Sequence, residues 1–170
     1  MTFRLEMTQG DWPAAEFAKG VEGLLAESMV LTLATAGPER GPHANLAFFA
    51  YDEDLVLYFV SERSTRHSLH LTEEARAAAT VFLPPPVFGE QLRGIQFTGR
   101  AGEAWGHHAE AAFAAYQGRY PSFGQDPDLR RQYLSGAGAA ALYRFQVDEL
   151  TAVDEPRFGR RNYLSARVLR

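Results

Sequence analysis

The chain has 170 residues, of which 46% are hydrophobic and 22% charged, so it fits one globular domain and excludes wholesale disorder and fibrous architectures. It contains no cysteine, which excludes disulfides, thiolate metal sites and cysteine nucleophiles. Its net charge of −4 argues against a general nucleic-acid-binding protein. It shows neither a run of about 18 uncharged apolar residues nor a signal-peptide pattern, so we expect a cytoplasmic protein without membrane contacts.

The two ends of the chain have distinct characters within a predicted single domain, 1–170. Segment 1–28 is expected to carry an N-terminal helix that Asp11 caps and that ends near Ser28, because the apolar residues from Phe17 to Leu25 share one face. Segment 156–170 has five arginines and no acidic residue. This basic C-terminal arm is either a surface strand with solvated charges or an arm that contacts an anion or a partner.

The central elements follow one another as hairpins. Asp52 to Asp54 is a turn between two β-rich runs, and Gly99 and Gly102 suggest a bend or bulge in a later strand. Strands that arrive as hairpins favour a small antiparallel barrel with peripheral helices, because closure removes exposed edges. Strands are expected at 29–35, 42–51, 55–60, 77–83, 94–105, 139–147 and 161–169, and helices at 65–74, 107–119 and 126–134. The strand aromatics Phe48, Phe49, Tyr58 and Phe59 are expected in the barrel core.

A polar turn before the predicted helix 65–74 carries the clearest chemical signal. Helix N-termini attract anions, Ser64 and Thr65 add hydroxyl donors, and Arg66 adds a planar cation that matches two phosphate oxygens. Arg63 is a further candidate. No glycine-rich phosphate loop occurs, so a phosphate-bearing ligand would be held by this turn. The alternative is structural: Ser64 only caps the helix and the arginines are solvated.

The order of these features resembles a known family. A hairpin, then Ser64-Thr65-Arg66 at a helix start, then RGIQFTG at 93–99 and Phe-Gly-Arg at 158–160, is similar to the FMN-binding split β-barrel superfamily related to pyridoxamine 5′-phosphate oxidase. A closer likeness is to a small bacterial branch of it. Ser64 matches the family's serine and Arg66 replaces its lysine, whereas Thr65 stands where arginine is usual. The resemblance implies an α+β fold with a six-stranded antiparallel split β-barrel, peripheral helices, bound FMN and a homodimer.

The resemblance also implies which residues bind the cofactor. The backbone of one hairpin strand lies along the flavin ring, the end of its partner strand lines the site, the polar turn holds the phosphate, and one later side chain is a candidate polar contact. These residues are Ala44, Asn45, Leu46 and Ala47, then Phe59, Val60 and Ser61, then Ser64, Thr65 and Arg66, and finally Gln96. Arg160 or Arg161 is expected to reach the site of the partner subunit.

Several functions remain open at this point. One hypothesis is an FMN-dependent oxidoreductase that transfers hydride between NADH or NADPH and an unknown small molecule. The alternatives are a non-enzymatic carrier of flavin or haem and an interaction scaffold with an occluded pocket. Pyridoxamine phosphate oxidation itself is not expected, because the resemblance implies that this activity needs a late arginine and histidine pair, and no histidine follows His108.

Histidines elsewhere in the chain allow two weaker hypotheses. His67, His70 and Glu74 share a helix face, but a polar surface is favoured there over a metal site, and no metal is expected. His43 precedes the strand that the resemblance places along the flavin, so it is a candidate ligand contact.

Overall fold

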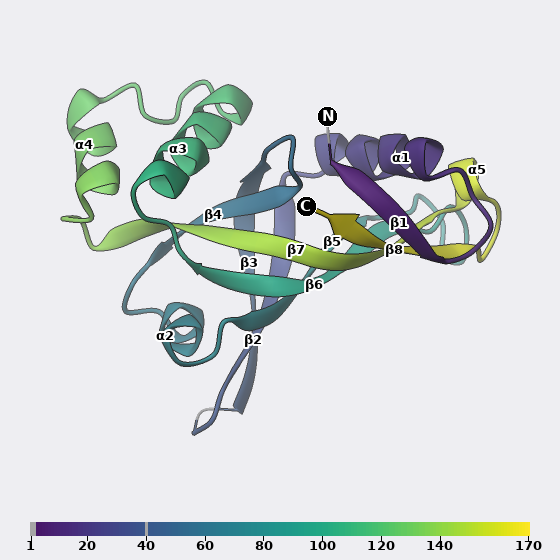
Figure 1. The fold of residues 1–170 in the computed structure, drawn as a ribbon, viewed down its shortest axis with the longest axis horizontal. Coiled ribbons are helices and arrows are strands. Elements are labelled where there is room, and N and C mark those ends of the chain that lie inside the picture. Colours follow the sequence, from purple (N-terminus) through teal and green to yellow (C-terminus); the bar gives the residue numbers. More distant parts are fainter. Residues whose placement is uncertain (1–2, 40) are drawn as a thin grey trace.

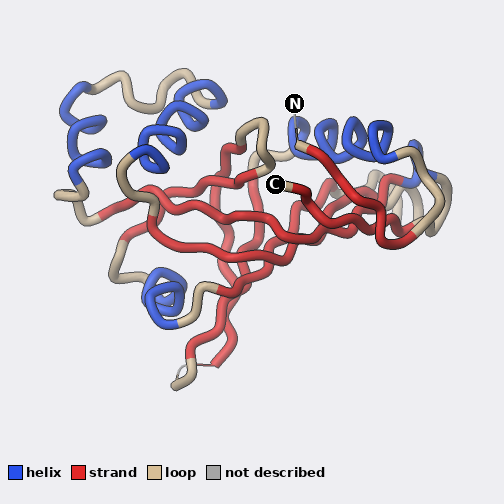
Figure 2. Tube along the Cα trace, in the orientation of Figure 1, coloured by secondary structure: helices blue, strands red, loops and turns tan. Residues whose placement is uncertain are grey.

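The strands of the computed structural model, which describes residues 3–39 and 41–170, form one antiparallel sheet that curls into a barrel (Figures 1 and 2). Helices lie around its outside. The elements are β1 Arg4–Gln9, α1 Ala14–Glu27, β2 Val30–Gly37, β3 Gly41–Tyr51, β4 Val56–Glu62, α2 Arg66–Glu73, β5 Arg76–Leu83, β6 Arg93–Glu103, α3 His107–Arg119, α4 Pro127–Ser135, β7 Ala140–Asp154, α5 Glu155–Phe158 and β8 Tyr163–Leu169.

The barrel closes through β7. This 15-residue strand pairs with β4 along one edge and with β6 along the other, which completes the ring β7-β4-β3-β2-β5-β6. Residues 149–153 of β7 also pair with β8, and β8 pairs with β1. Strands β8 and β1 therefore extend the sheet beyond the ring. The described part of the chain therefore confirms the predicted α+β class and the six-stranded antiparallel split barrel with peripheral helices.

The hairpin turn between β3 and β4 is confirmed as well. The carboxylate of Asp52 accepts hydrogen bonds from the backbone N–H groups of Asp54 and Val56, each at 3.0 Å, and from the hydroxyl of Tyr58 at 2.7 Å. One side chain thus satisfies both the turn and the start of the returning strand, which is why an Asp-rich sequence reverses the chain here.

The N-terminal segment differs from the prediction. Within segment 1–28, of which residues 1 and 2 lie outside the described residues, Arg4–Gln9 forms β1 instead of helix and pairs with β8. The prediction that Asp11 caps the helix is also wrong. Pro13 occupies the N-cap position, makes no side-chain cap bond, and the helix begins at Ala14.

Two apolar clusters stabilise the fold. The barrel interior is filled by side chains from every strand of the ring, among them the fully buried Phe59 and Phe145. The second cluster lies where α3 covers the outside of β3, β4 and β7, and it includes Tyr58 and Tyr116. The prediction that Phe48 belongs to the core is wrong, because Phe48 points to the outer face of β3 and is 60% exposed.

The predicted irregularity is a register shift at Gly99, and its extra residue, Asp148, lies on the partner strand β7 and not on β6. The register between β6 and β7 shifts between Thr98 and Gly99. A Cβ atom at Gly99 would lie 2.0 Å from the carbonyl oxygen of Gln146, so only glycine permits this close approach of the two backbones.

Among the helices of residues 3–39 and 41–170, none has the length and apolar character needed to cross a membrane.

Candidate functional site

The barrel is split between β3 and β4. These strands pair only from Phe49 to Tyr51 on β3, so over residues 41–48 the described structure gives β3 a strand partner on its β2 edge alone. The N–H of Phe49 bonds the carbonyl of Met29 on the β2 side. Because backbone groups alternate along an antiparallel strand, Ala44, Leu46 and Phe48 direct theirs toward the other, open edge. We call this open edge of residues 41–48 the seam.

The predicted ring-binding residues line the seam from both faces of β3. Ala44 and Leu46 are exposed on the outer face, whereas Asn45 and Ala47 are half-buried on the inner face. The side-chain oxygen of Asn45 is buried without a hydrogen-bond partner. A buried unpaired amide oxygen costs free energy unless a donor reaches it, so this atom is available to a ligand N–H group.

The predicted residues of β4 have three different environments. Phe59 is fully buried in the barrel core and stacks on Tyr143, with ring centroids 5.1 Å apart, so its side chain does not face the seam. Val60 points outward and packs against the α3 cluster. Ser61 turns toward the first turn of α2.

A group of hydroxyls surrounds that first turn, and we call Ser61, Thr65 and Ser68 the hydroxyl cluster. The Ser61 hydroxyl lies 3.0 Å from the hydroxyl of Thr65, and the Ser68 hydroxyl donates to Ser61 at 3.2 Å. His67 joins them, with its Nε2 atom 2.6 Å from the Ser61 hydroxyl. These groups are donors of the kind that a phosphate accepts from, and they stand at a helix N-terminus.

The predicted phosphate residues lie at the same turn. Thr65 is the N-cap of α2 but makes no side-chain cap bond to the first-turn amides, and Ser64 and Arg66 are exposed beside it. Ser64 is therefore not the cap. Arg63 is committed elsewhere, because its guanidinium makes a two-pronged ion pair with Glu103, with contacts between 2.5 and 3.1 Å.

Histidines connect α2 to the hairpin. The ring of His43 on β3 stacks on that of His67 at 6.0 Å and meets His70 edge-on at 6.1 Å. His70 is fully buried, with Nδ1 at 3.1 Å from the Thr35 hydroxyl and Nε2 without a partner. Burial, and then the neighbouring His43 and His70, lower the pKa of His67 below its usual 6.5. The sequence places His67 and His70 on one helix face but does not link them to His43, since only folding brings positions 43 and 67 together.

The remaining predicted groups lie apart from the seam. Glu74 turns away from the histidines to pair with Arg76 at 2.7 Å, and the described residues contain no group of three His, Asp or Glu side chains placed to hold a metal ion. Gln96 is exposed on β6. The strand registers place it in one row with Thr80, Thr32 and Leu46, which puts it about 14 Å from β3 at about 4.8 Å per strand.

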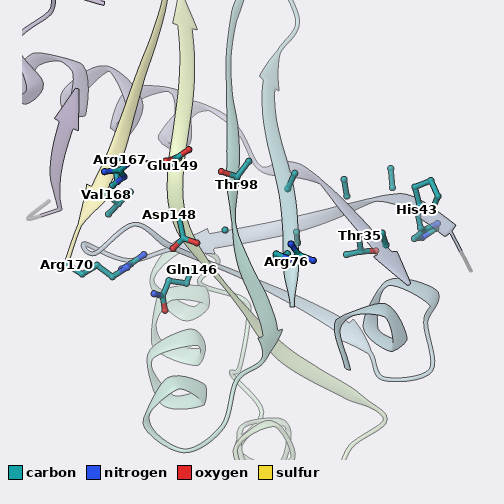
Figure 3. Close-up of a pocket in the computed structure, with 17 residues that line it drawn as sticks. Thr35, His43, Arg76, Thr98, Gln146, Asp148, Glu149, Arg167, Val168 and Arg170 are labelled. Atoms are coloured by element: carbon teal, nitrogen blue, oxygen red, sulfur yellow. Dashed lines mark ion pairs between the residues drawn. The ribbon is translucent and has the colours of Figure 1, made fainter. Parts of the chain in front are cut away.

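A groove of about 1080 Å³ runs across the outer face of the sheet beside the seam (Figure 3). Small side chains from β2, β3 and β5 line part of it, and His43 lies at one end. Arg76, Arg167 and Arg170 line it together with Asp148 and Glu149, so both charge signs are present. In the sequence, the signal for this groove is the recurrence of alanines on successive strands, at Ala34 and Ala36, Ala44, and Ala77 and Ala78.

Comparison with known proteins places the chain among bacterial relatives. No family model matches it. It is 32% identical over 103 residues to the UPF0306 protein PM1958 of Pasteurella multocida, an alignment that covers 60% of this chain and 68% of that protein.

Solved structures share the fold. The heme binding protein of Mycobacterium smegmatis has a TM-score of 0.68 at 18% identity, over 94% of this chain and 60% of that protein. A putative 5-nitroimidazole antibiotic resistance protein of Bacteroides thetaiotaomicron has a TM-score of 0.63 at 12% identity, over 100% of this chain and 93% of that one. At such identities the likeness speaks for the fold alone.

Proposed function

The chain belongs to the UPF0306 family, and we propose that it is an FMN-binding flavoprotein that transfers hydride between a reduced nicotinamide and a small molecule. The observation that carries this proposal is the seam: an unpaired strand edge that lies next to an uncapped helix N-terminus rich in hydroxyl groups. The split-barrel fold supports it, since the chain's resemblance to FMN-binding members of this fold rests on these same segments.

The phosphate end of the ligand is assigned to α2. The N-terminal amides of this helix carry a partial positive charge, and Arg66 at its first residue adds a full one. Ser64 and Thr65 stand beside it as hydroxyl donors. The hydroxyls of Thr65 and Ser61 now bond one another, so a phosphate would replace these mutual bonds by bonds to its own oxygens.

The flat ring is assigned to the seam. An isoalloxazine ring has hydrogen-bonding groups along one edge, and the open edge of β3 offers backbone N–H and C=O groups at Ala44 and Leu46. The unpartnered oxygen of Asn45 would accept from a ring N–H. The donor set therefore fits FMN, which when bound would supply the hydride chemistry while the protein supplies position and exclusion of water.

A haem carrier is the second candidate. The groove beside the seam is favourable for a flat anionic ligand, because it combines an imidazole, His43, with the cations Arg76 and Arg170. As a haem carrier, the protein would bind a planar cofactor without catalysing a reaction.

A homodimer is part of the proposal. The outer faces of β2, β3 and β5 expose apolar side chains next to the groove, and the mixed charges of the groove suit contact with a second copy. Arg160 and Arg161 lie between α5 and β8 in the chain, and α5 lies far from α2, toward the other end of the sheet (Figure 1). They would therefore contact the partner's site and not the site of their own chain.

Titration of the purified protein with FMN, followed by visible absorption and flavin fluorescence, tests binding. Anaerobic addition of NADH or NADPH to the loaded protein then tests turnover. Bleaching of the yellow colour supports the oxidoreductase, and persistent colour supports the carrier. A protein that binds haemin but leaves FMN fluorescence unchanged would favour the haem reading.

Replacing Arg66 tests the phosphate assignment. We expect Arg66→Ala to weaken FMN binding by about 1.5–3 kcal/mol, the range for a charge-assisted hydrogen bond, while riboflavin, which lacks the phosphate, binds both proteins equally. Arg131→Ala is the matched control, because Arg131 is an exposed arginine on α4 that pairs with Asp128. Equal FMN affinity of the wild type and Arg66→Ala would refute the phosphate site.

A further inference from the structure

The hydroxyl of Tyr116 lies at the point where β3 and β4 separate. It donates a hydrogen bond to the carbonyl of Phe48 on β3, with an O···O distance of 2.6 Å. Burial raises the pKa of this hydroxyl, and the backbone N–H of Val60 on β4, which faces it, acts to lower that pKa. One side chain from α3 therefore bridges the two strands immediately beyond their last pair, Phe49 with Phe59.

The bridge occupies the place of a strand–strand hydrogen bond. Hydrogen-bonded and non-hydrogen-bonded pairs alternate along an antiparallel ladder, and the open-edge groups of β3 belong to its even-numbered residues. The next hydrogen-bonded pair after Ala50 with Tyr58 would be Phe48 with Val60. The Tyr116 hydroxyl stands between these two partners and satisfies the Phe48 carbonyl, so the strands separate without leaving that carbonyl unpaired.

The position of Tyr116 is well defined by its surroundings. Its side chain is only 4% exposed and packs in the α3 cluster, with its ring centroid 4.9 Å from that of Phe123. One helical turn later, the hydroxyl of Tyr120 donates to the carbonyl of Phe49 at 2.7 Å. This second tyrosine binds β3 on its paired side, next to β2, and so anchors α3 without entering the seam.

We propose that Tyr116 is a positioning residue that holds the seam open for the flat ring of the ligand. This inference rests on the proposed function for its ligand and on the hydrogen bonds above for its geometry. Without the hydroxyl, Val60 N–H and Phe48 C=O can bond directly, which extends the β3–β4 ladder by one pair into the seam.

The test compares Tyr116→Phe with Tyr120→Phe. Tyr120 is the C-cap residue of α3, and each variant loses one hydroxyl that donates to a β3 carbonyl, so both lose similar stability. Closure of the ladder is read by NMR as a through-hydrogen-bond scalar coupling between the Val60 nitrogen and the Phe48 carbonyl carbon. We expect this coupling in Tyr116→Phe only, together with FMN affinity that is lower by about tenfold or more, against about twofold or less for Tyr120→Phe.

The outcomes separate the inference from the proposed function. Absence of the coupling in Tyr116→Phe, or equal loss of FMN affinity in the two variants, would overturn the role of Tyr116. Failure of the wild type to bind FMN would overturn the proposed function, and the coupling would still decide whether Tyr116 keeps the strands apart.

Discussion

His67 is a partly buried histidine with a hydrogen bond to Ser61 and a second imidazole stacked on its ring. Its Nε2 atom bonds Ser61, its ring stacks on His43, and its surroundings disfavour the protonated form. A neutral imidazole in the hydroxyl cluster can donate or accept, which lets the cluster change partners when an anion arrives. The titration of this residue should therefore be visible in the stability of the protein.

We expect acid to destabilise the protein partly through His67. Because its folded pKa lies below the usual 6.5, the unfolded chain takes up the proton first, and stability is lost as pH falls through that window. His67→Gln keeps a polar group near Ser61 without a titrating ring. Its melting temperature should fall less than that of the wild type between about pH 7 and pH 5, as measured by circular dichroism. The exposed His107→Gln is the control, and its melting temperature should fall as much as that of the wild type. An equal fall in His67→Gln would contradict this account.

At the scale of single elements, β6 shows how one residue shapes the barrel wall. Next to Gly99 the partner strand β7 carries one extra residue, Asp148, and the two strands form eleven pairs while the register shifts once. The bulge depends on the absence of a side chain, since the carbonyl of Gln146 fills the space that a Cβ would need.

Gly99→Ala should therefore destabilise the fold strongly. The added methyl would meet backbone atoms that cannot move independently, so we expect a loss of about 3 kcal/mol or more in the free energy of unfolding. Gly102→Ala, three residues along the same strand, meets no atom within 4 Å and should change stability by about 0.5 kcal/mol or less. Urea denaturation of the two variants measures the difference, and similar midpoints would be inconsistent with the close approach.

For the whole molecule, the notable surface is the outer face of β2, β3 and β5. Leu46 is 73% exposed and shares a shallow groove with Met29 and Phe82, both of them also more than half exposed. Exposed apolar groups gathered on one sheet face mark a contact surface. The proposed homodimer would cover this face.

Leu46→Glu should then produce a monomer. A buried unpaired carboxylate at the interface costs several kcal/mol, whereas the main-chain groups of β3 are unchanged. We expect light scattering to give twice the chain mass of 18.9 kDa for the wild type and the single mass for the variant. Trp105→Glu, on an exposed residue before α3 that lines neither groove, should remain dimeric. A wild-type protein of single-chain mass would reject the homodimer.

The sequence by itself determined the elements that depend on local physics. Helix α3 has the predicted bounds, and the Asp52 turn and the register shift at Gly99 lie where expected, because side-chain periodicity, turn chemistry and glycine act within a few residues. The antiparallel barrel followed from the order of hairpins. The location of the polar turn beside the hairpin was implied by family resemblance and not by any local pattern.

Only the tertiary structure decided which groups meet. Strand β1 was missed because its partner, β8, lies at the other end of the chain. Phe48 was assigned to the core because strand propensity does not say which face a helix will cover. The contact of His43 with His67 and the bridge of Tyr116 between β3 and β4 join residues far apart in sequence. Such contacts arise from the closing of the barrel and the docking of α3, which no local pattern encodes.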